Sequence, residues 1–170
     1  MAEKNYGKQF EKQIFEAFKR VPQVSIDRIP DQVTKYKGSS SNICDFIAYK
    51  YPILFYLECK SVHGSSLSIH SVPKPDKKGE LHGFYGNIRD NQWEGLMAKS
   101  QVQGVQAGVL VWWVDKDVTK YIPISTLAIL YASGQKSIRY DYEELPTITI
   151  QGKKKRTLFN YDMAEFLKNF

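Results

Sequence analysis

Two short apolar segments on either side of a proline turn constrain the fold of this 170-residue chain more than any other feature. Residues 46–49 and 53–57 are rich in Ile, Phe and Tyr, and Tyr51-Pro52 stands between them. Apolar runs of this length that break at a proline predict the two strands of a hairpin. Apolar residues occupy both faces of each run, so we expect the hairpin to lie inside a larger sheet that is covered on both sides.

Three charged residues are set at the ends of these two strands. Asp45 precedes the first run, and Glu58 and Lys60 follow the second. Glu58 and Lys60 share one face, because residues two apart in a strand point to the same side. If the turn pairs Lys50 with Ile53, counting outward places Asp45 opposite Glu58, with Cβ atoms roughly 4.5–5.5 Å apart.

Two carboxylates at that separation repel each other unless a proton or a cation lies between them. Mg2+ binds one or two carboxylates and keeps water molecules for chemistry, and we expect Mn2+ to substitute for it. Lys60 can then orient or polarise an attacking water, or stabilise charge on a phosphate. The residues leave a simpler interpretation open, which is a hairpin whose charged ends reach solvent.

Composition indicates one globular domain over residues 1–170, with 42% hydrophobic and 25% charged residues. No run approaches the ~20 apolar residues that span a bilayer, and the N-terminus lacks the apolar segment of a secretory signal. We therefore expect a cytoplasmic protein that does not enter a membrane. Cys44 and Cys59 lie next to the acidic residues and would face each other in the same hairpin register. We expect reduced thiols, while the register leaves a disulfide open.

The net charge of +6 predicts a polyanionic partner, and we expect DNA rather than a small-molecule substrate. A basic surface would hold the polyanion while the acidic pair holds the metal. The candidate DNA contacts fall in three polar segments and are Lys35 and Lys37, then Lys74, Lys77 and Lys78, then Lys153, Lys154, Lys155 and Arg156. Each segment also fits a plain solvated connection.

The remaining elements predict an α/β (α+β) fold, in which helices flank a central mixed sheet. We expect helices at 6–20, 87–103 and 125–132, and strands at 24–29, 106–114, 118–122, 137–142 and 147–150. A last helix begins after a cap at Asn160 or Asp162. Residues 30–42 form a basic loop, and residues 61–86 form a long flexible loop that faces the substrate.

Two residues outside the hairpin are further candidates for the site. Glu11 borders the apolar stripe of the first helix, where it makes a surface salt bridge or points at the metal. Gln92 lies in the first turn of the second helix, and its spacing alone favours an ordinary surface amide.

The spacing of Asp45, Glu58 and Lys60, D-x12-E-x-K, resembles the PD-(D/E)xK nuclease signature. Most of the chain resembles the RecU family of Holliday junction resolvases, which belong to the restriction-endonuclease-like nucleases. The segments that carry the resemblance are Asn5-Tyr6-Gly7 with Phe10-Glu11, Ser39-Ser40-Ser41, Phe55-Tyr56-Leu57-Glu58-Cys59-Lys60-Ser61, Asn87-Ile88-Arg89-Asp90-Asn91-Gln92, residues 109–113, and Tyr121-Ile122-Pro123 with Leu127.

The resemblance implies a restriction-endonuclease-like sheet and assigns roles to the candidate residues. Asp45, Glu58 and Gln92 become metal ligands, and Lys60 becomes the stabiliser of the transition state. It also implies a homodimer that resolves four-way junctions by paired nicks in recombination and repair, in a bacterium or a bacteriophage. The alternatives are a related endonuclease for branched or linear duplex DNA, and a non-catalytic DNA-binding protein with a decayed site.

The chain departs from the family pattern at three places. Ile43 stands where the family has a threonine that contributes to the metal site, and isoleucine cannot ligate a metal. Cys59 replaces the usual alanine. The basic stalk that enters the junction in the family corresponds to residues 30–42 and is much shorter here, whereas the loop at 61–86 is longer than typical.

Overall fold

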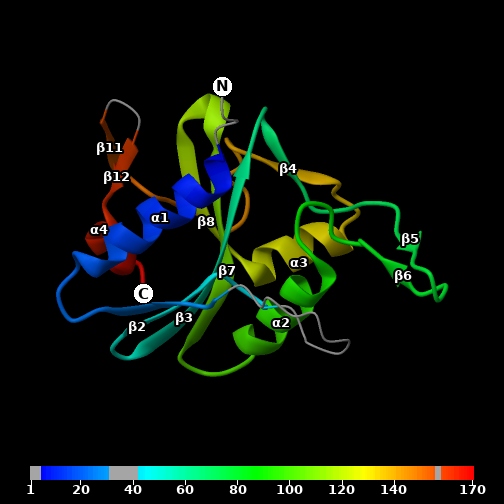
Figure 1. Cartoon of the computed structure of the whole chain (residues 1–170), viewed down its shortest axis with the longest axis horizontal. Helices are drawn as coiled ribbons and strands as arrows, with labels where there is room; N and C mark the ends of the chain where they lie inside the picture. Colours follow the sequence, from blue (N-terminus) through cyan, green and yellow to red (C-terminus); the bar gives the residue numbers. More distant parts are fainter. Residues whose placement is uncertain (1–4, 31–41, 156–157) are drawn as a thin grey trace.

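The computed structural model describes residues 5–30, 42–155 and 158–170 (Figure 1). The predicted fold class is confirmed, since a six-stranded mixed sheet is flanked by helices. The elements are α1 (Tyr6–Lys19), β1 (Ser25–Arg28), β2 (Phe46–Lys50), β3 (Ile53–Val62), β4 (Ser66–Ser68), β5 (Lys74–Pro75), β6 (Leu81–His82), α2 (Asp90–Ser100), β7 (Val105–Trp113), the 3-10 turn η1 (Val114–Lys116), β8 (Val118–Pro123), α3 (Ile124–Ala132), β9 (Ser137–Arg139), β10 (Ile148–Thr149), β11 (Gly152–Lys155), β12 (Leu158–Tyr161) and α4 (Met163–Leu167).

The central sheet has the strand order β1-β2-β3-β7-β8-β10. Strands β3 and β7 run parallel, and the other neighbours are antiparallel. The β2–β3 hairpin has the predicted register, with Lys50 opposite Ile53 and Phe46 opposite Leu57. The middle strand β7 is buried along seven of its nine residues, which explains its continuous apolar sequence.

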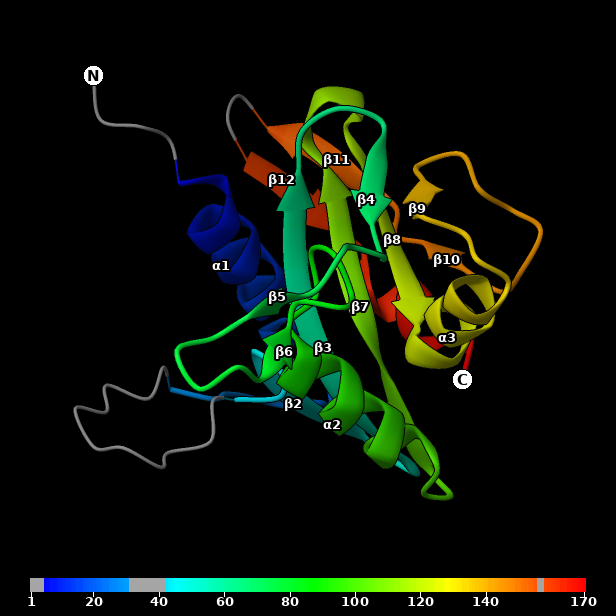
Figure 2. The ribbon, with the colours of Figure 1, turned by 90° about the vertical axis from the view of Figure 1, so that its right-hand side faces the viewer.

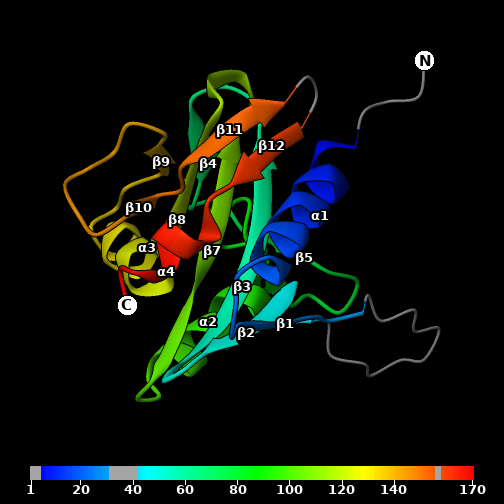
Figure 3. The same ribbon diagram turned by 90° about the vertical axis from the view of Figure 1, so that its left-hand side faces the viewer.

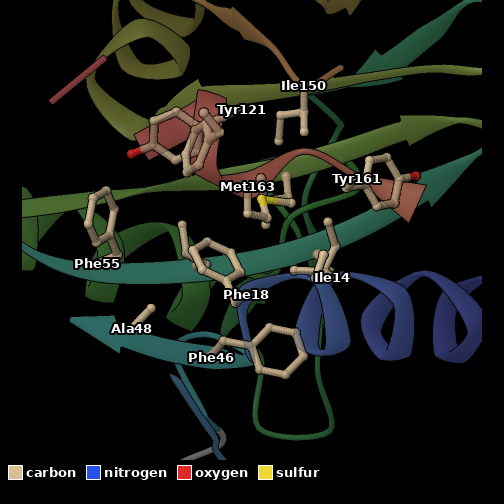
Figure 4. Packing of buried hydrophobic residues seen from close by; sticks show 14 of the residues in the cluster. Ile14, Phe18, Phe46, Ala48, Phe55, Tyr121, Ile150, Tyr161 and Met163 are labelled. Atoms are coloured by element: carbon tan, nitrogen blue, oxygen red, sulfur yellow. The ribbon is translucent and has the colours of Figure 1, made fainter. Parts of the chain in front are cut away.

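Helices cover both faces of this sheet, and the two faces have separate apolar cores (Figures 2 and 3). One core lies between the sheet and α1, α4 and β12, and Figure 4 shows members of this cluster, among them Ile14 and Phe18 from α1, Met163 from α4, and Phe55 and Tyr121 from the sheet. The other core lies between the sheet and α2, α3, β4 and β9. Alternate residues of β3 therefore point into different environments, with Leu57 and Cys59 toward α1 and Glu58 toward α2.

Helix α1 begins and faces inward as its sequence predicts. The side-chain oxygen of Asn5 accepts a hydrogen bond from the Lys8 backbone N–H at 3.0 Å, which confirms the predicted cap. Phe10, Ile14 and Phe18 are fully buried against the sheet. The last helix is capped by Asp162, one of the two predicted caps, whose side chain accepts from the Glu165 N–H at 3.0 Å.

The segment at 61–86, predicted as one long loop, contains regular structure. Strand β3 continues to Val62, β4 pairs with β9, and β5 pairs with β6 in a small hairpin. The two-residue strands of this hairpin are exposed and lack an apolar alternation, so periodicity could not reveal them. Helix α2 begins at Asp90 rather than at residue 87, because the Asn87 side chain instead accepts a hydrogen bond from the Ser68 N–H at 2.8 Å.

Residues 31–41 lie outside the described part of the chain, so the predicted stalk-like loop with Lys35 and Lys37 is not placed by the structure. Arg156 is also outside it. Within the described ranges, every helix is too short or too polar to cross a bilayer.

Candidate active site

The predicted site residues of the hairpin meet the N-terminal turn of α2 on one face of the sheet. Glu58 is only 2% exposed, and its Oε1 accepts hydrogen bonds from Gln92 Nε2 at 2.6 Å and from Lys60 Nζ at 2.8 Å. Lys60 Nζ also donates to Gln92 Oε1 at 3.0 Å. The three side chains form a closed triangle of hydrogen bonds, and Gln92 is 3% exposed rather than a surface amide.

Gln92 reaches this position because the start of α2 is held on two sides. Its Oε1 accepts the Arg89 backbone N–H at 3.2 Å, which satisfies a free donor at the helix N-terminus. The Asn91 side chain donates to the Asn42 carbonyl at 3.0 Å, next to the entry of the chain into β2. The helix is thereby docked beside the strand that follows Asn42.

Ile43, which cannot bind a metal, packs against Gly95 of α2. A Cβ atom added to Gly95 would lie 2.3 Å from Ile43 Cγ2, so the glycine allows α2 to approach this side chain closely. Gly95 is one helical turn from Gln92. The Ile43–Gly95 contact therefore sets how near Gln92 comes to Glu58.

We expect Gly95→Ala to lower the free energy of unfolding by about 1–3 kcal/mol, the usual cost of overpacking, although alanine favours a helix. Urea denaturation measures this change. Gly7→Ala in α1 is the matched control, because a Cβ there has no neighbour closer than 3.6 Å. Adding Ile43→Ala to Gly95→Ala should recover part of the lost free energy of unfolding, because the smaller side chain makes room for the new Cβ. A double variant whose loss equals the sum of the two single losses would contradict the proposed contact.

Asp45 lies where the β2–β3 ladder ends. Its backbone N–H donates to the Leu57 carbonyl at 3.1 Å, one residue away from the register of the rest of the hairpin. Its Oδ2 accepts the Cys59 N–H at 2.7 Å. The local pairing therefore differs from the regular one that predicted Asp45 opposite Glu58, but the two carboxylates remain electrostatic neighbours.

Burial dominates the electrostatics of both carboxylates. It raises the pKa of Glu58 to about 7, against the lowering effect of Lys60, and the Asp45 carboxylate adds to the increase. Burial also raises the pKa of Asp45, although the Cys59 N–H, Lys60, a hydrogen bond with the Glu58 carboxyl and Arg28 act in the opposite direction. Keeping both groups ionised in this place requires additional positive charge.

One atom of the site fits a divalent cation. Glu58 Oε2 is buried and has no hydrogen-bond partner in the described part of the chain. A buried carboxylate oxygen without a partner is unfavourable, and it faces a second carboxylate in an oxygen-rich setting that suits Mg2+ or Mn2+. Asp45 and Glu58 are therefore the residues that would hold the metal.

Glu58 predicts how the stability of the metal-free protein depends on pH. Its folded pKa of about 7 lies above the ordinary value of 4.5, so between these values the folded protein binds more protons than the unfolded chain. The free energy of unfolding should therefore decrease as pH rises through this window, by on the order of 3 kcal/mol at most. We expect Glu58→Gln to flatten this decrease in urea titrations in EDTA at pH 5 to 8. Parallel curves for the two proteins would contradict the assignment.

Glu11 lies beside this group rather than within it. Its carboxylate forms an ion pair with Arg28, at the end of the edge strand β1. Arg28 was not predicted as a site residue, and its electrostatic effect reaches Asp45. The signal that could have revealed it is the pairing of β1 with β2, which places Arg28 opposite Phe46, the residue after Asp45.

Both cysteines are free and buried, as the reduced-thiol prediction expects. Burial, with the nearby Glu58 carboxylate, raises the pKa of Cys44 to about 12. Burial likewise raises the pKa of Cys59 well above its ordinary value. The thiols are therefore protonated near neutral pH and are poor nucleophiles or metal ligands.

The described basic candidates lie on two hairpins. Lys74, Lys77 and Lys78 are exposed on or near β5–β6, and the base of this hairpin is tied to α2 because Asp90 accepts the Gly83 and Phe84 N–H groups at 2.7 and 3.0 Å. Lys153, Lys154 and Lys155 lie on β11, in a hairpin that the sequence did not predict. Lys154 there forms an ion pair with Asp117.

A second group of metal-binding side chain types lies at the tip of β5–β6. Asp76, Glu80 and His82 bring one ligand atom each within 4.8 Å of one another, and all three are exposed. Asp76 Oδ1 already accepts the Lys78 and Glu80 N–H groups at 2.7 and 2.9 Å, so its carboxylate has a role in forming the turn. The buried, unpartnered oxygen of Glu58 makes Asp45 and Glu58 the stronger candidate.

The chain was also compared with known proteins. A scan against protein-family models found no match, and a search of the curated proteins found none either.

Proposed function

We propose that this protein is a Mg2+-dependent DNA endonuclease that cuts four-way junctions. The observation that carries this proposal is the pair of the buried Glu58 and the half-buried Asp45, with an unpartnered Glu58 oxygen and with Lys60 and Gln92 bonded to Glu58. A decayed site in a DNA-binding protein would not need to keep a buried glutamate in such a costly environment.

Each residue has a distinct role in this proposal. Asp45 and Glu58 would hold Mg2+ or Mn2+, and a metal bound there would lower the pKa of a coordinated water and offset negative charge on the phosphate. Lys60, whose Nζ lies 2.8 Å from Glu58, would stabilise the negative charge that develops on the phosphate. Glu11 acts through its ion pair with Arg28, which keeps a positive group near Asp45.

Gln92 positions the other groups. Its Nε2 donates a hydrogen bond to Glu58 and so orients that carboxylate. Its Oε1 accepts hydrogen bonds from Lys60 Nζ and from the Arg89 backbone N–H. The family resemblance implies that Gln92 is a third metal ligand. To bind the cation, Gln92 Oε1 would have to give up its hydrogen bonds from Lys60 and Arg89. In the arrangement observed here, Gln92 fixes the direction of the Glu58 carboxylate.

The DNA substrate follows from charge and from the resemblance to RecU resolvases. The net charge of +6 favours a polyanion. The exposed lysines lie on or near β5–β6, and the base of that hairpin is hydrogen-bonded to the helix that carries Gln92. A homodimer would supply two equivalent sites for two symmetric strands of a junction. We place this activity in the cytoplasm, in DNA recombination and repair.

The test is cleavage of a labelled four-way junction and of a linear duplex with the same sequence, each with Mg2+ and with EDTA. We expect paired, Mg2+-dependent nicks in the junction and little cutting of the duplex. Equal cutting of both substrates would indicate an endonuclease for ordinary duplex DNA. Binding without cutting in Mg2+ or Mn2+ would instead indicate a non-catalytic DNA-binding protein.

A further inference from the structure

Figure 3 shows α1 and the β11–β12 hairpin side by side on one face of the sheet, opposite to the face that carries Glu58. A groove lined by residues of both elements lies between them. It consists of two adjoining cavities of about 440 and 270 Å3, and both are lined by Arg20 and Asn160. Arg20 donates a hydrogen bond to the Asn160 side chain across the groove. We call this feature the α1–β12 groove.

Cations line the α1–β12 groove from both sides. Lys12 comes from α1 and Arg20 is the residue that caps its C-terminus. Lys155 lines the smaller cavity, and Lys153 lines the larger one. Lys153 and Lys155 share a face of β11 because they are two residues apart. Lys154 lies between them in sequence, points to the other face and pairs with Asp117.

Two acidic residues lie in the same groove, and they do not cancel its positive charge. Glu16 lines the smaller cavity, where Lys12, Arg20 and Lys155 outnumber it. Asp162 lines the larger cavity, but its carboxylate is occupied in capping α4. The groove therefore presents excess positive charge in a concave setting, which attracts anions more strongly than a flat surface does.

The smaller cavity also contains a buried donor without an acceptor. Gln13 is 8% exposed and lines this cavity, and its Oε1 accepts the Phe159 N–H at 3.3 Å. That bond fixes which end of the amide is nitrogen. Gln13 Nε2 then has no hydrogen-bond partner in residues 5–30, 42–155 and 158–170. Buried amide groups are normally satisfied, so this one indicates an absent acceptor.

The wall of the cavity is formed by specific packing. The Phe159 ring lies against Gly152 so closely that a Cβ there would be 2.3 Å from Phe159 Cε1. Only glycine allows the ring to occupy this position, where it lines the smaller cavity beside Gln13. The cavity is therefore bounded by cations, one unpartnered amide and an aromatic ring.

We propose that the α1–β12 groove binds phosphate groups, either the phosphodiesters of a nucleic-acid strand or the phosphate of a free nucleotide. Lys12, Arg20 and Lys155 would neutralise the charge of a phosphate in the smaller cavity. The buried Gln13 amide would turn toward the cavity, so that Nε2 donates to a phosphate oxygen. Lys153 and Lys155 are thereby assigned to this groove and Lys154 is excluded from it. The proposal does not require the metal site, because the two places are on opposite faces of the sheet.

The test uses the full chain in EDTA, so that cleavage cannot occur, and fluorescence anisotropy with a labelled single-stranded oligonucleotide. The double variant Lys12→Ala/Lys155→Ala should bind about tenfold more weakly, and the slope of log affinity against log salt should fall by about 1.4. Lys8→Ala/Lys154→Ala is the matched control, since it removes two charges from the same two elements outside the groove. Equal losses in the two double variants would overturn the proposal.

A second measurement tests the buried amide directly. In NMR spectra of the wild-type protein, the Gln13 side-chain N–H signals should shift on titration with the oligonucleotide. A shift with deoxynucleoside monophosphate and inorganic phosphate as well would identify free phosphate as the ligand, and a shift with the oligonucleotide alone would identify a strand. Unchanged Gln13 signals with all three probes would overturn the proposal even if a Gln13 variant failed to fold.

Discussion

Replacing Asp45 with asparagine is expected to lower junction cleavage by roughly a thousandfold or more, since metal-bound catalysis contributes several kcal/mol to the barrier. Asparagine keeps the size of the side chain, and its oxygen can still accept the Cys59 N–H, so the end of the β2–β3 ladder remains intact. What the substitution removes is negative charge from the metal site. Single-turnover cleavage of a labelled junction at saturating enzyme measures the loss.

Binding separates this effect from a structural one. Junction affinity of Asp45→Asn, measured by anisotropy in EDTA, should stay within about twofold of the wild type, because no phosphate contact is lost. Asp141→Asn is the matched control. Its carboxylate is exposed and bonded to Arg139, so its removal should leave cleavage unchanged. Loss of binding by Asp45→Asn, or retained cleavage, would count against its role as a metal ligand.

Lys60→Ala is expected to slow cleavage by about a hundredfold to a thousandfold with little change in junction affinity. In the proposed mechanism the ammonium stabilises charge that develops on the phosphate, so its loss would act on the transition state more than on binding. Lys50→Ala, on the same hairpin but at its turn, is the control. A rate equal to that of the wild type would remove Lys60 from the mechanism.

The same variant should also change the pH profile of the reaction. Lys60 lowers the pKa of the buried Glu58 carboxyl, against the effect of burial. Without that cation the pKa of Glu58 rises, and the glutamate needs a higher pH to ionise and bind the metal. The acidic limb of the rate profile should therefore move to higher pH in Lys60→Ala, a shift that a purely positional role would not produce.

The sequence predicted the parts of the site that depend on local rules. A proline turn and a two-residue period placed Glu58 and Lys60 on one face, and the hairpin register follows from the same counting. The end of the ladder at Asp45 was not predictable, because the Asp45 carboxylate accepts the Cys59 N–H as a backbone carbonyl would in a regular ladder. No pattern in the sequence indicates that the Asp45 side chain takes the place of a backbone carbonyl at this point of the ladder.

The contribution of Gln92 depends on tertiary packing, which spacing does not encode. Its burial requires Gly95 against Ile43 and the Asn91–Asn42 hydrogen bond, and each joins segments about fifty residues apart. Only the family resemblance pointed to Gln92. The β11–β12 hairpin was missed for another reason, since three consecutive lysines in β11 carry no apolar alternation.

The first turn of α2 connects two parts of the molecule that would act at different stages of a reaction. Asp90 holds the base of the β5–β6 hairpin, and Gln92, two residues later, holds Glu58. A movement of the outer hairpin would therefore act on the same helical turn that orients the Glu58 carboxylate. If the proposed substrate contacts this hairpin, its binding and the orientation of Glu58 would depend on one turn of helix.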